Sequence, residues 1–534
     1  MKRIAISWIL CAMAVMIMAK PAYRGPIVRV DENGNEQTVY LHGDESFHFL
    51  TDKTGQWLDE KTLRPLTETQ KNARLDTAIA HKARRAPQQE LVGGKPNIAP
   101  RGLLVLVNFQ DVKFTTHKDT VDSMLNGSNF TRHYSFTHDN KEYEIISSGS
   151  ARQYFIDQSW GQYQPVFDVV GPVTVSQDMA YYGANDASGN DKRPEVMVRE
   201  ACKIAHDDLG VDFSLYDNNN DDDVDFVYVI YAGYGEADGG SSNTIWPHSY
   251  NLSNTDNEIE LNGKTVDKYA CGCELSFYTK HYDGIGTFCH EFSHVLGLPD
   301  LYPTNGANHK TLGMWDLMDY GPYNNEGNTP PAYSAYERFY MGWLTPRVLK
   351  EPESVWLGFL NEDQQALIIC QGDEHNLKGY NPYPTTFYML ENRLPQGWDA
   401  YNPGGALLIT KIQYVATKWS SNTVNNSARS MGIDLIEADK IAPSYDKKNR
   451  DNGYFGKLSD VFPAGASEWT DFAGHEVTQI AQTGTGAIVF SYRGAQLTDI
   501  EQVESSQPAT KILRDGKIII IRDGVEYTVL GNRL

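Results

Sequence analysis

The chain has 534 residues, which at roughly 150 residues per domain suggests about three or four structural units rather than one small module. It carries 69 acidic and 47 basic residues, a net charge of −22, and 40% of its residues are hydrophobic. This composition supports packed cores and excludes wholesale disorder. The negative charge and the lack of a basic stripe argue against nucleic acid as a partner, and they suit a soluble exported protein or one that gathers cations.

The first nineteen residues have the pattern of a secretory signal peptide. Lys2 and Arg3 precede an apolar run over 4–18, and the small residue Ala19 follows. The run is short for a membrane span, although an uncleaved anchor is the alternative interpretation. We therefore expect residues 1–19 to be removed and the protein to be secreted or held at the cell surface.

Removal of the signal takes one cysteine away and leaves an odd number of them. The five that remain are Cys202, Cys271, Cys273, Cys289 and Cys370. An odd count is not expected of a disulfide framework, and the Cys-Gly-Cys at 271–273 lacks the second pair of a structural zinc site. We interpret these cysteines as mostly structural.

Residues 20–97 have the character of a prosegment. A strand-like piece at 36–50 is followed by a polar helical stretch that ends in a basic cluster at 81–87. Pro87 stops a helix there, and a Gly-Gly pair follows at 93–94. An exposed basic cluster before such a linker suits cleavage by an external activating protease, while a solvated helix end is the alternative.

The rest of the chain divides by pattern into an α/β part and a β part. The continuous apolar run at 102–109 predicts a buried strand and the start of a catalytic α/β domain over 98–345, in which helices and strands alternate. Short strands, Gly and Pro turns and aromatic residues predict a mainly β domain over 346–493. A linker over 494–510 and a small β tail over 511–534 with two Asp-Gly turns complete the prediction.

The most informative stretch is HEFSHVLGLPD, residues 290–300. On a helix, His290 and His294 lie one turn apart on the same face, so their two imidazoles can bind one ion. Glu291 lies beside that face, where a general base can reach the water on the metal without being a ligand. The spacing therefore predicts a zinc site with catalytic function.

The residues after the second histidine supply a third ligand. Gly297 can take a positive φ and end the helix, and Pro299 prevents the helix from resuming, so the chain can turn and bring Asp300 to the metal. Three protein ligands leave a fourth position open for water, which distinguishes a catalytic from a structural zinc site. The alternative, a chance HExxH on an ordinary helix, becomes rare once the following GxxD is included. His309 is a rival third ligand outside the motif.

The next informative stretch downstream is GMWDLMDYG, residues 313–321. Met318 in a tight turn beneath a three-ligand site can form an apolar floor, and Tyr320 two residues later can direct its hydroxyl at the metal or at a developing oxyanion. Met and aromatic residues at this spacing are often plain core, so only the position after the zinc helix favours the functional interpretation.

These motifs resemble the immune inhibitor A family of secreted zinc metalloproteases, relatives of the metzincins, over about 101–493. The resemblance rests on residues 290–302, 313–321, Gly342-Trp343, Leu390–Arg393 and Gly397–Asp399. It implies an α/β metzincin-like zinc protease domain followed by a mainly β domain, with zinc bound by His290, His294 and Asp300. It also implies Glu291 as general base, Met318 in the Met-turn and, from astacin-like and serralysin-like relatives, Tyr320 near the oxyanion.

An acidic loop at 217–225 resembles the start of an EF-hand-type calcium loop. Oxygen-bearing side chains occupy every second position, namely Asp217, Asn219, Asp221, Asp223 and Asp225. A structural Ca²⁺ would neutralise them. Asp222 stands where Gly is expected and Tyr228 where a bidentate Glu should close the shell, so a solvated acidic turn is the alternative. His248, further along, can line the substrate groove or satisfy a hydrogen bond in the core.

The tail at 511–534 resembles the sorting tails of the type IX secretion system of Bacteroidetes, which would make secretion machinery a partner. The alternative is a hairpin that extends the β domain. Together the observations predict a secreted zymogen, a zinc endopeptidase that hydrolyses protein or peptide substrates by a Glu-activated, zinc-bound water. A cell-surface binding or adhesion protein with a vestigial zinc site is the competing hypothesis.

Overall fold

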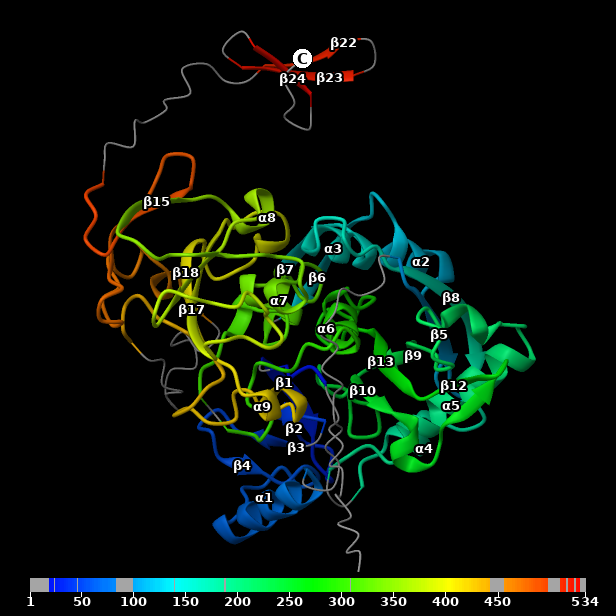
Figure 1. The fold of residues 1–534 in the computed structure, drawn as a ribbon. Helices are drawn as coiled ribbons and strands as arrows, with labels where there is room; N and C mark the ends of the chain where they lie inside the picture. Colours follow the sequence, from blue (N-terminus) through cyan, green and yellow to red (C-terminus); the bar gives the residue numbers. More distant parts are fainter. Residues whose placement is uncertain are drawn as a thin grey trace, which may run out of the picture.

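A computed structural model describes residues 19–23, 25–45, 47–82, 99–138, 140–186, 189–307, 309–441 and 456–497, together with three strands between 510 and 528. The predicted signal sequence 1–18, most of the basic cluster and Gly-Gly linker, and most of the linker at 494–510 lie outside the described residues. No helix among the residues described is long and apolar enough to cross a membrane. The chain forms a mixed α/β structure (Figure 1).

The N-terminal part forms a small antiparallel sheet in the order β1-β2-β3-β4. Its elements are β1 (Pro26–Val30), β2 (Glu36–Asp44), β3 (Phe47–Thr51), β4 (Trp57–Leu58) and the helix α1 (Glu68–Lys82). One face of this sheet packs on Ala237 and Trp246 of the following part. The strand-like piece predicted at 36–50 corresponds to two strands, β2 and β3.

A five-stranded sheet in the order β10-β13-β9-β5-β8 forms the next layer. Its strands are β5 (Arg101–Asn108), β8 (Val166–Thr174), β9 (Val227–Tyr234), β10 (His248–Asn251) and β13 (Lys268–Leu275). β5, β8, β9 and β13 pair in parallel, and β10 is the antiparallel edge. Alternate side chains of β5 enter two different cores, which explains its unbroken apolar sequence.

Helices cover both faces of this sheet. The core on one face contains α5, and the core on the other contains α2, α3 and α6. The helices are α2 (Lys118–Asn126), α3 (Ala151–Gln158), α4 (Met179–Gly183), α5 (Pro194–Asp207), α6 (Gly286–Val295) and α7 (Ala335–Tyr340). Two small hairpins accompany them: β6 (Thr131–His138) with β7 (Lys141–Ser148), and β11 (Ile259–Leu261) with β12 (Lys264–Val266).

The part after residue 346 is rich in strands. One sheet has the order β14-β16-β17-β18-β19 and another the order β15-β21-β20. The elements are β14 (Arg347–Val348), β15 (Glu353–Leu357), α8 (Leu360–Asp363), β16 (Leu367–Cys370), β17 (Thr386–Arg393), β18 (Ala406–Gln413), α9 (Ala416–Ser420), β19 (Ile433–Leu435), β20 (Val477–Gln482) and β21 (Ile488–Tyr492). Figure 1 shows α6 between this strand-rich part and the five-stranded sheet.

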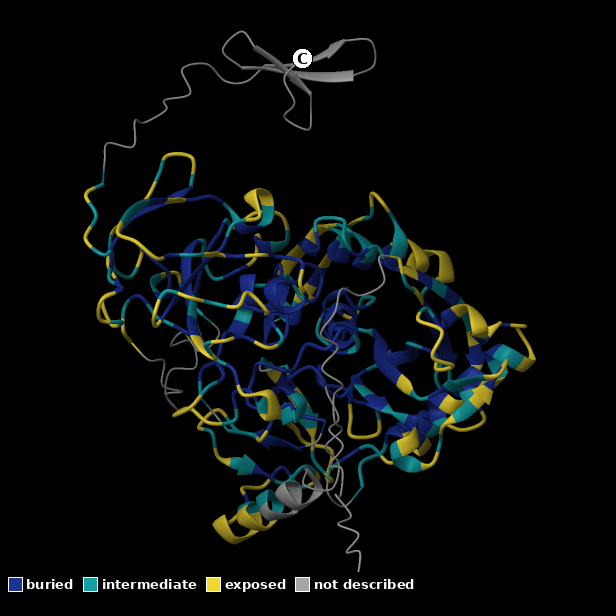
Figure 2. Ribbon diagram, in the orientation of Figure 1, coloured by how far each residue is buried: buried dark blue, intermediate teal, exposed yellow. Residues whose placement is uncertain are grey.

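A single apolar core joins α6 to the strand-rich part. It contains Phe292 of α6, Phe339 of α7 and Leu390 of β17 among its buried members. Figure 2 shows α6 as part of this buried interior. The two parts thus share one core, and residues after 346 can contribute directly to the surroundings of α6.

The cysteines predicted to be structural do lie in the interior. All five cysteines in the described part are free and buried, as expected of structural residues.

The tail forms β22 (Thr510–Arg514), β23 (Lys517–Arg522) and β24 (Val525–Thr528), an antiparallel sheet. The two Asp-Gly turns lie outside the described residues, and the sorting role of the tail stays a prediction.

Candidate active site

The helix α6 places the two predicted histidine ligands side by side. His290 and His294 are buried, and their ring centroids lie 4.8 Å apart. Nδ1 of His290 lies 2.8 Å from the carbonyl oxygen of Leu317, and Nδ1 of His294 lies 2.8 Å from that of Leu298. A carbonyl only accepts, so each Nδ1 carries the hydrogen and each Nε2 keeps a lone pair for a metal.

Asp300 returns to the same point because the helix ends as predicted. Gly297 has a φ of 95°, and Asp300 Oδ1 lies 3.2 Å from Nε2 of His290 and 3.3 Å from Nε2 of His294. Ligands that stand about 2.0–2.1 Å from zinc in a tetrahedron are about 3.3–3.4 Å apart. The observed spacing of the three ligand atoms therefore suits a tetrahedral ion.

Four buried polar atoms around this point have no hydrogen-bond partner. They are His290 Nε2, His294 Nε2, Asp300 Oδ1 and Glu291 Oε2. One ligand atom from each of His290, Glu291 and His294 also lies within 4.8 Å of the others. Buried polar atoms without a partner are costly, and a cation at their centre would satisfy them. This donor set of two nitrogens and a carboxylate fits Zn²⁺.

The protonation states of the ligands favour a cation as well. Burial lowers the pKa of His290, so its imidazole is neutral. Burial alone would raise the pKa of Asp300, but the neighbouring His294 and His290 hold it below its usual range, so the carboxylate is ionised. A neutral imidazole and an ionised carboxylate are the forms that bind metal.

A residue of the strand-rich part orients Asp300, which the sequence did not indicate. Asn422 lies just after α9, and its side-chain NH₂ donates to Asp300 Oδ2 at 2.6 Å while its Oδ1 accepts from the backbone N–H of Asp300 at 2.7 Å. Both residues are buried. The second carboxylate oxygen is thereby occupied, which leaves Oδ1 for the metal. No pattern around Asn422 distinguishes it in the sequence.

Glu291 is fully buried beside the three ligand atoms. Burial, together with the Asp300 carboxylate, raises its pKa well above the usual range. Its Oε1 accepts a hydrogen bond of 2.9 Å from the backbone N–H of Lys20, and its Oε2 is the unpartnered oxygen noted above. The carboxyl group thus has one oxygen on a peptide nitrogen and the other toward the ligand atoms.

The predicted Met-turn supports the ligands through its backbone. Met318 is buried, and its carbonyl accepts from the N–H of Leu301, next to Asp300, at 2.8 Å. The adjacent carbonyl of Leu317 is the one that orients His290. Tyr320 is also buried, with its ring packed against Tyr302 at a centroid distance of 6.4 Å.

Residues 19–23 run past the histidines as an extended segment, here called the N-terminal segment. Its main chain is held by six hydrogen bonds. Three involve Ala19 and Lys20: Tyr302 OH donates to the carbonyl of Ala19, Lys20 N–H donates to Glu291, and Trp246 Nε1 donates to the carbonyl of Lys20 at 3.2 Å. In the other three, Tyr323 OH donates to the carbonyl of Pro21 at 2.6 Å, and the N–H groups of Ala22 and Tyr23 donate to the carbonyls of Gly43 and Ala237 at 2.8 Å each. A peptide bond, between Ala19 and Lys20, therefore lies at Glu291.

The two remaining histidine candidates lie elsewhere. His248 is buried, with Nδ1 2.7 Å from the carbonyl of Trp246 and Nε2 2.9 Å from Tyr269 OH, and burial lowers its pKa to about 4. Of the two interpretations of His248, the structure agrees with a histidine whose hydrogen bonds are satisfied in the core. His309 Nε2 lies 2.8 Å from the carbonyl of Asn425, so this nitrogen is directed at the strand-rich part rather than at Asp300.

The acidic loop at 217–225 is arranged around its own backbone and one lysine. The Asp217 carboxylate accepts from the N–H groups of Asp221 and Asp222, and Lys264 Nζ lies 2.8 Å from Asp217 and 2.7 Å from Asp222. Asp222 has a φ of 71°, the conformation usual for the glycine it replaces. Asp225 accepts from Asn218 instead of facing a shared centre. Calcium binding there stays a prediction.

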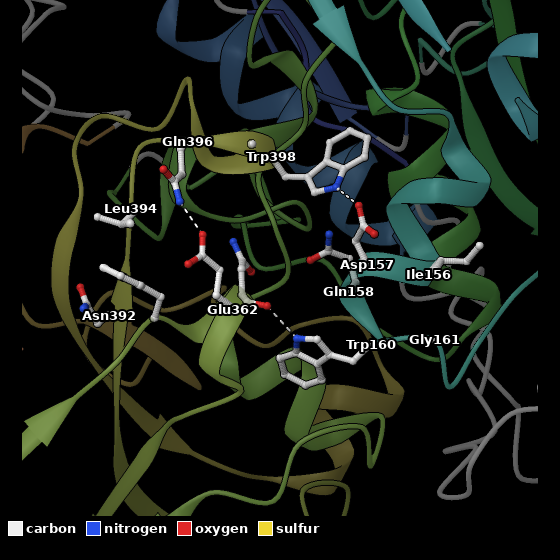
Figure 3. A pocket seen from close by; sticks show the side chains of 13 residues that line it. Ile156, Asp157, Gln158, Trp160, Gly161, Glu362, Asn392, Leu394, Gln396 and Trp398 are labelled. Atoms are coloured by element: carbon white, nitrogen blue, oxygen red, sulfur yellow. Dashed lines mark hydrogen bonds between the residues drawn. The ribbon is translucent and has the colours of Figure 1, made fainter. Parts of the chain in front are cut away.

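A cavity of about 510 Å³ lies between α3 and the strand-rich part, and it is separate from the histidine site. Trp160 and Trp398 line it, and their indole nitrogens donate to the Asn361 carbonyl and to Asp157 at 2.8 Å each (Figure 3). None of its lining residues belongs to 290–300. The indole donors are satisfied, so the cavity presents no unpaired donor from its tryptophans.

The histidine site lies in a segment of the chain that is similar to a known family of proteins. Residues 97–344 match the family model described as immune inhibitor A peptidase M6, catalytic domain. Immune inhibitor A of Bacillus thuringiensis subsp. alesti is 30% identical over 261 residues, which cover 43% of this chain and 38% of that protein. Pre-pro-metalloprotease PrtV of Vibrio cholerae serotype O1 (strain M66-2) is 26% identical over 217 residues, 36% of this chain and 23% of that protein.

The matched segment thus spans well under half the length of these curated relatives. It includes α6, the three candidate ligands and the Met-turn, and it ends before the strand-rich part that contains Asn422. Over residues 97–344, the chain is thus similar to the catalytic domain of the immune inhibitor A peptidase M6 family.

Proposed function

We propose that the protein is a secreted zinc endopeptidase that cuts protein or peptide substrates. The observation that carries this proposal is the convergence of His290, His294 and Asp300 on one point, with the Glu291 carboxyl beside them. The match of residues 97–344 to a peptidase family model supports it.

His290, His294 and Asp300 would hold the metal in the arrangement described above. When bound, Zn²⁺ supplies a Lewis acid that polarises the scissile carbonyl and makes a neighbouring water acidic near neutral pH. Glu291 takes a proton from that water on one carboxyl oxygen and delivers it to the nitrogen of the leaving amine. Its hydrogen bond to the Lys20 N–H marks where that nitrogen lies.

Tyr302 is the residue that we assign to the carbonyl side of the scissile bond. Its hydroxyl donates to the carbonyl oxygen of Ala19, in the same peptide group whose nitrogen side bonds Glu291. A donor at that oxygen stabilises the negative charge that develops during attack. Tyr320, the residue predicted for this role from the sequence, packs against the Tyr302 ring and would support its position.

We infer that the chain is made as a zymogen in which the N-terminal segment blocks the site. Lys20, the first residue after the predicted signal peptide, occupies Glu291 through its backbone nitrogen, so a substrate cannot reach this group until the segment leaves. Arg29 of β1 adds contacts to the carbonyl oxygens of Gly239 and Gly240. Cleavage in the linker before residue 98 by an external protease would free the catalytic part.

The proposal is tested on the full-length chain after limited proteolysis. We expect about one zinc per chain, cleavage of casein, loss of cleavage with a chelator and its return when zinc is added back. Stoichiometric zinc without casein or peptide cleavage would overturn the endopeptidase assignment. Cleavage that persists in the complete absence of metal would overturn the zinc assignment.

A further inference from the structure

The side chain of Lys20 enters a buried acidic pocket next to Glu291. Lys20 Nζ lies 2.7 Å from Asp238 Oδ1, donates to Thr287 Oγ1 at 2.9 Å and lies 4.8 Å from the ring centre of Tyr323. Thr287 Oγ1 in turn donates to Asp283 at 3.0 Å. We call these four residues, Asp238, Asp283, Thr287 and Tyr323, the lysine pocket.

The pocket holds its two carboxylates away from water. Asp238 is 5% exposed and Asp283 is 7% exposed, while Lys20 itself is 2% exposed. Burial alone would lower the pKa of the Lys20 ammonium, but Asp238 and Asp283 raise it overall, so the ammonium is charged. Burial raises the pKa of Asp283 to about 6, and the Lys20 charge opposes that rise. Departure of Lys20 would leave these acids buried without the cation that now offsets them.

The position of Lys20 along the segment indicates which substrate residue the lysine pocket would bind. Its backbone nitrogen is the one bonded to Glu291, and the general base of a peptidase must return a proton to the nitrogen of the leaving amine. The residue that carries this nitrogen is the first residue after the scissile bond. Lys20 therefore occupies the place of that substrate residue, and its pocket is the one that residue would enter.

A metal ion is the other cation to consider, because Cys273 offers its sulfur within 4.8 Å of a carboxylate oxygen of both Asp238 and Asp283. Burial raises the pKa of the Cys273 thiol well above its usual range, so a metal that bound there would have to displace its proton. Only a thiolate is a good metal ligand. The ammonium in place, with Thr287 and Tyr323 arranged around it, is the better match to the site.

The size of the pocket favours lysine over arginine. With Lys20 in place, the remaining cavity is about 10 Å³, which is no more than a single water requires. A planar guanidinium is larger than an ammonium and presents its donors as a fixed fork. The carboxylates and Thr287 are already arranged about a single point charge.

We propose that the lysine pocket selects substrates with a lysine immediately after the bond that is cut. This inference rests on the proposed peptidase function and adds its specificity. An apolar residue in that place would leave Asp238 and Asp283 buried without a cation, and an acidic residue would add a like charge. The N-terminal segment would block the site by the same contact that a substrate uses.

The test uses the full-length chain, loaded with zinc and activated by limited proteolysis. Internally quenched peptides that differ only in the residue after the cut, Lys, Arg, Leu or Glu, are compared by kcat/KM, and mass spectrometry locates each cut. We expect the Lys peptide to exceed the Leu peptide by about tenfold or more, with Arg between them and Glu lowest. Asp238→Asn should remove the Lys advantage, measured as a fall in the Lys-to-Leu ratio of kcat/KM, whereas Glu142→Gln, an exposed acid on β7, should leave both rates unchanged.

Cleavage of Lys and Leu peptides at equal rates would overturn the pocket and leave the peptidase function intact, whereas zinc-loaded protein that cuts none of them would count against the function itself. A second measurement does not depend on turnover or on a protein variant. The acetylated peptide of residues 20–23, Lys-Pro-Ala-Tyr, should bind the activated chain more tightly than its Met-Pro-Ala-Tyr analogue in calorimetry. Equal affinities would refute the proposal, and so would a second metal ion per chain in elemental analysis.

Discussion

The two sides of the candidate site are built in different ways. On the metal side, the stretch 290–300 supplies all three proposed ligand atoms and the proposed general base, and one helix with the turn after it sets their spacing. On the side that holds the peptide, the contacts join distant parts of the chain, and partners are up to 302 positions apart, as for Tyr323 and Pro21. A change on the metal side should therefore affect every substrate, and a change on the peptide side should affect orientation and selectivity.

The largest effect is expected from Glu291→Ala on the metal side. The variant loses the group that moves the proton, so kcat/KM should fall by about 10²–10⁴-fold. His290, His294 and Asp300 remain, so the zinc content measured by elemental analysis should be unchanged. Undiminished casein cleavage by the variant would show that another group is the base.

The next effect separates Tyr302 from Tyr320 on the peptide side. Tyr302→Phe removes the hydroxyl that donates to the carbonyl of Ala19, and loss of one such donor costs about 10²–10³-fold in kcat. Tyr320→Phe keeps the ring that packs against Tyr302 and should have a much smaller effect. Steady-state kinetics on one peptide compare the two variants. A larger loss of kcat in Tyr320→Phe than in Tyr302→Phe would indicate that Tyr320 stabilises the oxyanion.

A smaller effect, on zinc affinity, is expected from Asn422, the residue of the strand-rich part that bonds Asp300. Asn422→Ala frees Asp300 Oδ2 and should weaken zinc binding by about 10–100-fold, as measured by competition with a chelator. Asn426→Ala is the matched control, because Asn426 bonds the backbone of Thr304 rather than Asp300. Equal zinc affinities of the two variants would mean that Asn422 does not position the ligand.

The smallest effect is a pH dependence of the contact between the N-terminal sheet, β1 to β4, and the part of the chain after residue 98, which contains Glu236. His48 Nε2 of β3 lies 3.4 Å from Glu236, with Glu60, Arg74 and the Trp246 ring also near it. Burial alone would lower the pKa of His48, but Glu236 raises it to about 9.

Because this pKa lies above the ordinary value of 6.5, the contact contributes fully below pH 6.5 and is lost as the pH rises through about 9. Activation by limited proteolysis should therefore become a few-fold faster between pH 7 and pH 9.5, as followed by gel analysis with a protease whose own pH dependence is corrected. His48→Phe should remove most of this dependence. An unchanged pH profile in the variant would show that another group controls release.

Much of the metal side could be predicted from the sequence. The i, i+4 spacing of the histidines, the left-handed Gly297 and the return of Asp300 are consequences of local backbone geometry, and the structure brings these residues together. The run at 102–109 likewise predicted a buried strand, which the structure has at β5. Local patterns sufficed because each of these features depends on residues a few positions apart.

The peptide side was decided by tertiary structure alone. Lys20 and Asp238 are ordinary charged residues in the sequence, and nothing near Asn422 marks it as a partner of Asp300, 122 positions earlier. The sequence by itself determined which atoms can hold the ion, because one helix and one turn fix their spacing. Only long-range packing decided what surrounds the ion, because a buried charge gains its partner from whichever distant segment the shared core brings against it.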